Sequence, residues 1–229
     1  MERRVCRRLP YSHDCSYSFV EAAPIPDAFG NLTKLTWLSN AYSNRIGSIP
    51  SSIGALSALQ LVAFPGNSLK GSFPTVLTPL GSTLKEIYLF ENNFTGPISR
   101  DQWALMGNLT IARIEENQFT GTLPDDIGRL YSTNPKLFSI GRNSFRGTLP
   151  SSMSQFPPNL FILDVSGNQF TGIIPANLSA STLLLRRNNF TGTVPESTCM
   201  NVQEIVYDCN RSLVCSCNCI CGIDYVHPF

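Results

Sequence analysis

Apolar and polar residues follow a pattern that recurs about every 25 residues through the middle of the chain. A typical copy has apolar residues eight, five and three positions before an asparagine, a glycine four positions after it and a proline seven after it. The asparagines are Asn67, Asn92, Asn117, Asn143, Asn168 and Asn188, and Ser43 takes the same place in an earlier copy. Successive anchors lie 24, 25, 25, 26, 25 and 20 residues apart, which identifies a repeat array.

The apolar spacing predicts one short strand in each repeat. In the copy anchored at Asn92, Ile87 and Leu89 point inward, whereas the residues that alternate with them point outward. We expect the asparagine to lie inside and to hydrogen-bond backbone groups that the turn would otherwise leave unpaired. The glycine allows a sharp bend, and the proline ends strand pairing. The stretch 51–59 then returns the chain along the opposite side as a short helix or 3₁₀ turn.

A single repeat cannot bury its own apolar face, so the repeats must stack on one another and the two ends need covers. The predicted fold is an α/β repeat solenoid, a right-handed superhelix with a concave parallel β-sheet and short helical, 3₁₀ or irregular convex segments. We expect an N-terminal cap over residues 1–24, an array of about seven repeats over 25–195 and a cysteine-rich C-terminal cap over 196–229.

Cysteines occur only near the two ends of the chain. They are Cys6, Cys15, Cys199, Cys209, Cys215, Cys217, Cys219 and Cys221. An even number confined to the termini predicts disulfide-stapled caps and an oxidising compartment, with the connectivity left open. The alternating cysteines over 215–221 are also compatible with a metal site, but structural zinc more often uses Cys-x-x-Cys spacing. We therefore favour disulfides and expect no metal or other cofactor.

Six Asn-x-Ser/Thr sequons agree with a secreted or extracellular location. They begin at Asn31, Asn93, Asn108, Asn177, Asn189 and Asn210. The first residues do not form a signal peptide, because no apolar run follows the arginines. No stretch reaches the roughly 20 apolar residues that a transmembrane helix needs. The formal net charge of +1 gives no general attraction to nucleic acid.

The fuller phrase Asn-x-Phe-Thr-Gly-x-φ-Pro, at 117–124 and 168–175, resembles plant-type leucine-rich repeats. Such repeats occur in receptor-kinase ectodomains and polygalacturonase-inhibiting proteins, and the resemblance implies a second strand in each repeat. It covers about 25–195 and is specific for the fold, but it says little about the ligand. The ends depart from it: the Cys-x-Trp motif usual in plant caps is absent, and the tail from Asp208 looks like those of secreted microalgal proteins with such repeats.

The residues expected to face outward on the concave sheet form the candidate partner-binding surface. They include Glu86, Tyr88, Phe90, Glu91, Arg113, Glu115, Arg142, Asp164 and Arg186. Exposed aromatic residues beside an acidic group, with arginines farther along, suit a binding hot spot and its rim. The predicted function is therefore non-catalytic recognition of a protein or glycan partner, centred on the repeats anchored at Asn92 and Asn117. For any one of these residues, the alternative is a solvated face with a few ion pairs.

Two further roles remain open from the sequence. The chain could be a structural subunit of a larger assembly, or of a membrane-anchored complex, in which a neighbour covers the predicted exposed residues Trp37, Leu61 and Phe90. The resemblance also allows an enzyme inhibitor.

Ice binding and catalysis have less support. Thr122, Thr148 and Thr193 follow the turn glycines in the column that ice binding would need, but Pro97 and Ile173 interrupt that column. An enzyme is not expected: the two histidines, His13 and His227, lie at opposite ends, which leaves no evident nucleophile and base pair.

Overall fold

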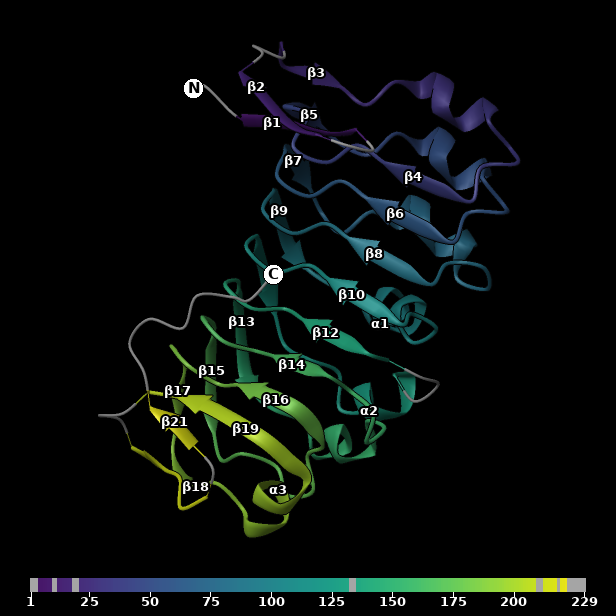
Figure 1. Cartoon of the computed structure of the whole chain (residues 1–229). Helices are drawn as coiled ribbons and strands as arrows, with labels where there is room; N and C mark the ends of the chain where they lie inside the picture. The colour runs from purple at the N-terminus through teal and green to yellow at the C-terminus, as the bar shows by residue number, and fades with distance from the viewer. Residues whose placement is uncertain are drawn as a thin grey trace.

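A computed structural model describes residues 4–9, 12–17, 21–131, 135–208, 212–217 and 219–221, the first two ranges by their backbone alone. Strands and short helical segments alternate along the chain and stack into an elongated array (Figure 1). The strands of a long sheet follow one another from the purple end to the yellow end, with most helical segments at their right in this view (Figure 1). The fold is the predicted repeat solenoid.

The concave sheet has one strand from each coil. Its nine parallel strands, in chain order, are β4 (Trp37–Ser39), β6 (Leu61–Ala63), β8 (Glu86–Tyr88), β10 (Ile111–Arg113), β12 (Leu137–Ser139), β14 (Ile162–Asp164), β16 (Ala180–Leu184), β19 (Val202–Tyr207) and β21 (Cys219–Cys221). The register keeps equivalent positions side by side, so that Val62, Ile87 and Ala112 are neighbours across β6, β8 and β10.

A second parallel sheet provides the additional strand that the resemblance implies. Its eight strands are β3 (Ala23–Pro24), β5 (Arg45–Gly47), β7 (Ser68–Gly71), β9 (Asn93–Pro97), β11 (Gln118–Gly121), β13 (Ser144–Thr148), β15 (Gln169–Gly172) and β17 (Asn189–Phe190). The seven strands from β5 to β17 each follow an asparagine anchor or Ser43 within two residues. We call the outer surface of this sheet the lateral face.

The convex side carries the predicted short helical segments. Those of 3₁₀ type are η1 (Asp27–Asn31), η2 (Ser51–Ala55), η3 (Thr75–Leu80) and η4 (Ser151–Gln155), and the α-helices are α1 (Arg100–Met106), α2 (Ile127–Leu130) and α3 (Glu196–Asn201). Several begin directly after the repeat proline, whose fixed φ suits the entry into a helical turn. Ser99 replaces that proline before α1 and forms a capping box with Gln102.

One apolar core runs through the whole array. The residues predicted to point inward are buried in every coil, as Ile87 and Leu89 show with no exposed surface. The position two residues after each anchor adds a row of phenylalanine rings, in which Phe94, Phe119 and Phe145 stack at centroid separations of 6.0 and 6.4 Å. The core is therefore continuous from coil to coil, as stacking repeats require.

The anchor asparagines form a buried hydrogen-bonded column. Asn117 is typical: its Nδ2 donates to the carbonyl oxygens of Ile114 at 3.1 Å, Glu115 at 3.2 Å and Leu89 of the preceding coil at 2.9 Å. Its Oδ1 accepts the backbone N–H of Phe94, also in the preceding coil, at 3.0 Å. The side chain thus satisfies polar groups in two coils at once, as the sequence predicts.

The repeat glycines make room between coils as well as allowing the bend. Gly147 and Gly172 have φ of +87° and +79°, a region that favours glycine. A Cβ on Gly172 would lie 2.9 Å from Cγ2 of Thr148, and one on Gly147 would lie 3.1 Å from Cγ2 of Thr122. The side chain that follows one glycine therefore packs onto the next glycine in the stack.

The parallel sheets continue past residue 195, the predicted end of the array. Strand β19 pairs with β16, β21 pairs with β19, and a short pair joins β18 (Gly192–Thr193) to β20 (Leu213–Val214). The cysteine-rich segment therefore adds parallel strands to this end of the stack. At the other end, β1 (Arg4–Leu9) and β2 (Ser12–Tyr17) form an antiparallel pair with Cys6 opposite Cys15.

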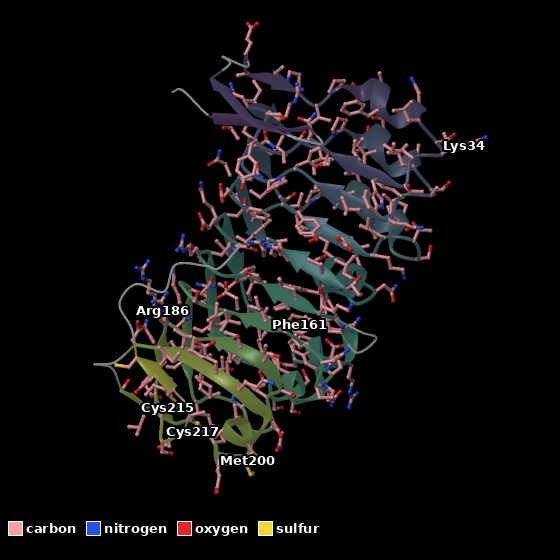
Figure 2. The ribbon with its side chains drawn as sticks, viewed as in Figure 1. Lys34, Phe161, Arg186, Met200, Cys215 and Cys217 are labelled. Atoms are coloured by element: carbon pink, nitrogen blue, oxygen red, sulfur yellow. A yellow bond between two sulfur atoms is a disulfide. The ribbon has the colours of Figure 1, made fainter. Side chains whose placement is uncertain are left out.

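Disulfides join Cys199 to Cys217 and Cys215 to Cys219. Cys221 is disulfide-bonded as well. Cys209 and the side chains of Cys6 and Cys15 lie outside the described residues. Figure 2 shows Cys215 and Cys217 together at the yellow end of the stack. The disulfide prediction is thus confirmed for the cysteines of the C-terminal segment that the structure describes.

The asparagine column generates a stability prediction. Replacing Asn117 by alanine removes four hydrogen bonds and leaves buried backbone groups unpaired, so we expect the free energy of unfolding to fall by about 3 kcal/mol. Chemical denaturation followed by circular dichroism measures the change. The adjacent, exposed Gln118 is the matched control, and Gln118→Ala should alter stability by less than about 0.5 kcal/mol. Equal losses in both variants would contradict the structural role of the column.

Candidate functional site

The outward positions of β8 and β10, and of the turns after them, bring the predicted binding residues together in the middle of the concave face. We call Tyr42, Phe90, Glu91, Arg113, Glu115 and Glu116 the central cluster. Tyr42 is included because its ring lies over Gly66, whose backbone N–H donates to the carbonyl oxygen of Phe90. Burial raises the pKa of its phenol, and the charge of Glu91 is the next largest cause. Glu116 and Tyr42 directly precede an anchor, as Glu91 does, so the repeat spacing was the signal for both.

Arg113 links the aromatic and acidic parts of the central cluster. Its guanidinium carbon lies 4.1 Å from the centre of the Phe90 ring, a cation–π contact. The same side chain pairs with Glu115, with its Nε 2.7 Å and its Nη2 2.5 Å from Oε1. Phe90, predicted to be exposed, is consequently only half-exposed, because Arg113 covers one face of its ring.

Glu115 is buried, although the sequence places it on an exposed face. Only 4% of the residue is exposed, and both contacts from Arg113 use Oε1. Its other oxygen, Oε2, is buried without a hydrogen-bond partner among the described residues. Burial raises the pKa of the Glu115 carboxyl to about 7, even though Arg113 partly offsets that rise. The group therefore changes its charge near neutral pH.

Asp164 also corrects the expected exposure, since it has no exposed surface. Its Oδ2 accepts the Ser139 hydroxyl at 3.0 Å, and its Oδ1 accepts the backbone N–H and the hydroxyl of Ser166 at 2.9 and 2.7 Å. The side chain lies against the backbone of Gly141, where a Cβ would come within 2.5 Å of Oδ2. Asp164 thus folds onto its own sheet and is a poor candidate for direct contact with a partner.

The residue immediately before each anchor has a left-handed backbone in all seven coils. Glycine occupies this position twice, as Gly66 and Gly167, each with φ of +63°. In the other five coils it is occupied by Tyr42, Glu91, Glu116, Arg142 and Arg187, with φ between +49° and +55°. We call these five residues the left-handed row. Such a backbone costs a residue other than glycine roughly 1 kcal/mol.

Side chains of the left-handed row contact one another along the stack. Arg142 Nη1 lies 2.6 Å from Oε1 of Glu116, and a Cβ on Gly167 would lie 3.1 Å from Cγ of Arg142. At the other end of the row the ring of Tyr42 covers Gly66, where a Cβ would come within 2.1 Å of it. Side chains of the row thus cover both glycine positions, and one ion pair joins two members of the row.

The remaining predicted residues lie around the central cluster or away from it. The Tyr88 hydroxyl donates to Oε2 of Glu86 at 2.7 Å, and burial together with this bond raises the pKa of Tyr88. Arg186 lies toward the yellow end of the stack (Figure 2), in the coil anchored at Asn188. Of the residues expected to need a covering neighbour, Trp37 is 69% exposed, whereas Leu61 is half-buried.

The described sequon asparagines all lie off the concave sheet. Asn31 ends η1, Asn108 follows α1, and Asn177 precedes β16. Asn93 and Asn189 lie on β9 and β17 of the lateral face. All five are exposed, and Asn210 lies outside the described residues. Glycans at these positions would leave the central cluster open and would stand on the convex side and the lateral face.

The lateral face carries the threonine column that ice binding would need. Thr122, Thr148 and Thr193 are exposed in one column of this face, and Ile173, 68% exposed, interrupts the column as its spacing predicts. A plant ice-binding protein has a related fold, with a TM-score of 0.59 and 20% identity over 91% of this chain and 83% of that one. At that identity the likeness concerns the fold alone.

Metal binding, histidine chemistry and membrane spanning were also considered for the described residues. The Sγ atoms of Cys199, Cys215 and Cys217 lie within 4.8 Å of one another, and each is part of a disulfide. His227 and the side chain of His13 lie outside the described residues. In the part of the chain that the structure describes, no helix has the length and apolar character needed to cross a bilayer.

Comparisons with known proteins agree with this geometry. The family model described as Leucine Rich Repeat matches residues 159–181. Receptor-like protein 35 of Arabidopsis thaliana is 36% identical over 172 residues, which is 73% of this chain and 17% of that protein. The chain therefore spans less than a fifth of this curated relative.

Solved ectodomains share the fold over most of the chain. A TDR receptor superposes with a TM-score of 0.75 and 29% identity, over 85% of this chain and 33% of that one. The ectodomain of the Arabidopsis receptor kinase HAESA, solved with a peptide hormone ligand, superposes with a TM-score of 0.72 and 28% identity, over 85% and 32%.

The raised pKa of Glu115 generates a prediction about stability and pH. The carboxyl holds its proton up to about pH 7 in the folded chain but only to about 4.5 when unfolded, so the folded chain binds the extra proton between these values. Stability contributed by this group is then fully present below pH 4.5 and is lost as the pH rises through about 7.

We expect the wild-type free energy of unfolding to fall by about 2–3 kcal/mol more than that of Glu115→Gln between about pH 5 and about pH 8. Parallel denaturation curves of the two proteins give this difference directly, because other titrating groups are common to both. Asp125→Asn, at an exposed carboxylate, serves as the control and should follow the wild type. Identical pH profiles for the wild type and Glu115→Gln would contradict the burial of this charge.

Proposed function

Since the chain is a leucine-rich-repeat protein of the plant type, we propose that it is a non-catalytic binding module that recognises another protein through its concave face. The binding surface is the central cluster together with Tyr88, in the coils anchored at Asn92 and Asn117. The observation that carries this proposal is the left-handed row, because it places large polar side chains where glycine would relieve backbone strain.

The cost of the left-handed row supports a role beyond folding. Gly66 and Gly167 show that glycine is compatible with this position in the same array. Five coils nevertheless carry tyrosine, glutamate or arginine there, at roughly 1 kcal/mol each. The Arg142–Glu116 ion pair is partly exposed and contributes too little to offset this strain by itself. Strained residues that persist in one row favour a functional use of their side chains.

The composition of the surface also suits recognition of a protein. Aromatic residues and arginine are the types that most often dominate binding energy, and here Arg113 contacts Phe90 while the Tyr42 ring covers the neighbouring Gly66. The array holds them on parallel strands, so little order has to be gained when a partner binds. The five described sequons leave the approach to this face open.

The relatives suggest what kind of partner the chain binds and where the chain is located. HAESA was solved with a peptide hormone ligand, and the sequence relative is a receptor-like protein. By analogy, we place the chain in an extracellular setting and its partner among proteins or peptides. Because the chain spans 17% of Receptor-like protein 35, the proposal concerns this segment and not a whole receptor.

A second candidate role is that of a subunit docked in a larger assembly. The observation in its favour is Trp37, 69% exposed on β4, which is the last strand at its edge of the concave sheet. A large apolar side chain at a sheet edge suits a permanent neighbour. This role predicts that Trp37→Ala, and no substitution in the central cluster, releases what co-purifies with the chain.

The test of the proposed function first requires the partner. It is cross-linked to the purified chain in an extract of the native source and identified by mass spectrometry. Replacing Tyr88, Phe90 or Arg113 singly by alanine should weaken its affinity at least about 10-fold, because each substitution removes part of the central contact surface. Biolayer interferometry measures the affinity, and circular dichroism confirms that each variant is folded.

Thr120→Ala is the matched control for that experiment, because Thr120 is exposed on β11 of the lateral face. Its affinity for the partner should equal that of the wild type. If all three concave variants also bind as tightly as the wild type, the proposed site is wrong. If Thr120→Ala alone weakens binding, the lateral face is the recognition surface.

A further inference from the structure

We propose that the central cluster accepts a lysine or arginine side chain from an extended basic segment of the partner, with the Glu115 carboxylate as its ion-pair acceptor. This inference rests on the proposed function, because it names the chemistry of a ligand for the same concave surface. It stands on an unpaired buried oxygen, on the balance of charge around it and on the aromatic rings beside it.

The unpaired oxygen belongs to Glu115. Oε1 receives both donors from Arg113, whereas Oε2 is buried with no donor among the described residues. An ionised carboxylate accepts hydrogen bonds at both oxygens, and a buried one without them is destabilised. A second cationic donor reaching Oε2 would complete the set, in the way that carboxylates in proteins often hold two basic groups.

The charge around Glu115 favours a cation over an anion. The central cluster and the adjacent Glu86 hold four carboxylates, on Glu86, Glu91, Glu115 and Glu116, and two guanidiniums lie among them, on Arg113 and on Arg142. Both arginines are already engaged with glutamates, at 2.5 and 2.6 Å. When these four carboxylates are ionised they exceed the two guanidiniums by two negative charges, which attract a basic segment and repel an acidic one.

Aromatic rings suit the aliphatic part and the charged end of such a side chain. Arg113 already occupies a cation–π position on Phe90, which shows that the cluster holds a guanidinium against a ring. Tyr42 is 46% exposed and has one face against Gly66, so its ring is available from the solvent side. A lysine or arginine stem passing Tyr42 would bury apolar surface while its charged end reaches Glu115.

Binding of a cation would be coupled to pH through Glu115. The charges that act on it are those of Arg113, on its own coil, and of Asp164 on β14, and Tyr42, Glu91 and Glu116 are the other titratable groups of the cluster. A bound cation stabilises the ionised carboxylate and lowers its pKa from about 7. Affinity should then rise with pH as the carboxylate loses its proton, by about 10-fold between about pH 6 and about pH 8.

A random 12-residue peptide library displayed on phage tests the ligand class with the intact chain as the target. We expect the selected peptides to be enriched in lysine and arginine and to lose binding to Tyr88→Ala. Peptides that lose binding to Tyr88→Ala but show no basic enrichment would overturn the cation inference and leave the concave binding function standing. Peptides that bind Tyr88→Ala as tightly as the wild type would overturn both.

The role of Glu115 is measured by calorimetry with the tightest selected peptide. Glu115→Gln keeps the size of the side chain, and it should weaken binding about 10-fold at about pH 8 and remove most of the pH dependence. Asp125→Asn is the matched control, since Asp125 is exposed on the turn before α2, and it should bind as the wild type does. Equal affinity and an unchanged pH profile for Glu115→Gln would overturn the assignment.

Discussion

The hydrogen bonds of the buried asparagine column hold the rest of the structure in place. Each asparagine binds carbonyl groups of its own turn and both a carbonyl and an N–H of the preceding coil, as Asn117 does with Leu89 and Phe94. Neighbouring coils are thereby fixed at one spacing and one rotation. The phenylalanine that follows two residues later then stacks on its equivalent, and the strand before the asparagine joins the concave sheet in register. A satisfied buried polar group thus specifies the packing of the apolar core around it.

The same column accounts for the strain that the array tolerates. The residue before each anchor lies in the left-handed region, which costs roughly 1 kcal/mol where it is not glycine. Four hydrogen bonds at each asparagine, each worth about 1 kcal/mol net, exceed that cost. Before an asparagine, the position is therefore free to carry Glu91, Glu116, Arg142 or Arg187 without loss of the fold. The scaffold holds these side chains in a fixed row, so the variation between coils supplies the chemistry of the surface.

Sequence patterns predicted the features that repeat and missed those that depend on a single neighbour. The alternation of inward and outward residues, the buried asparagines and the helical convex turns all recur, so several copies point to the same register. The burial of Glu115 depends on the rotamer that Arg113 takes over Phe90, and that of Asp164 depends on the missing Cβ of Gly141. Such contacts join different coils and have no counterpart in spacing. Strands β19 and β21 lie past the last anchor, Asn188, so the repeat spacing gives no register for them.

Glu115 shows how a recognition surface and a stable scaffold make opposite demands on one residue. A glutamine there would remove the buried charge, and a small apolar residue would leave Arg113 free to extend into solvent. The carboxylate is disfavoured in the folded chain above about pH 7, so its retention lowers stability at that pH. Its unpaired Oε2 leaves one strong acceptor unsatisfied in the middle of the concave face. A partner that supplies the missing donor recovers that energy on binding, whereas a partner without one does not. The unsatisfied Oε2 of the free surface therefore favours a partner with a cationic donor over a partner without one.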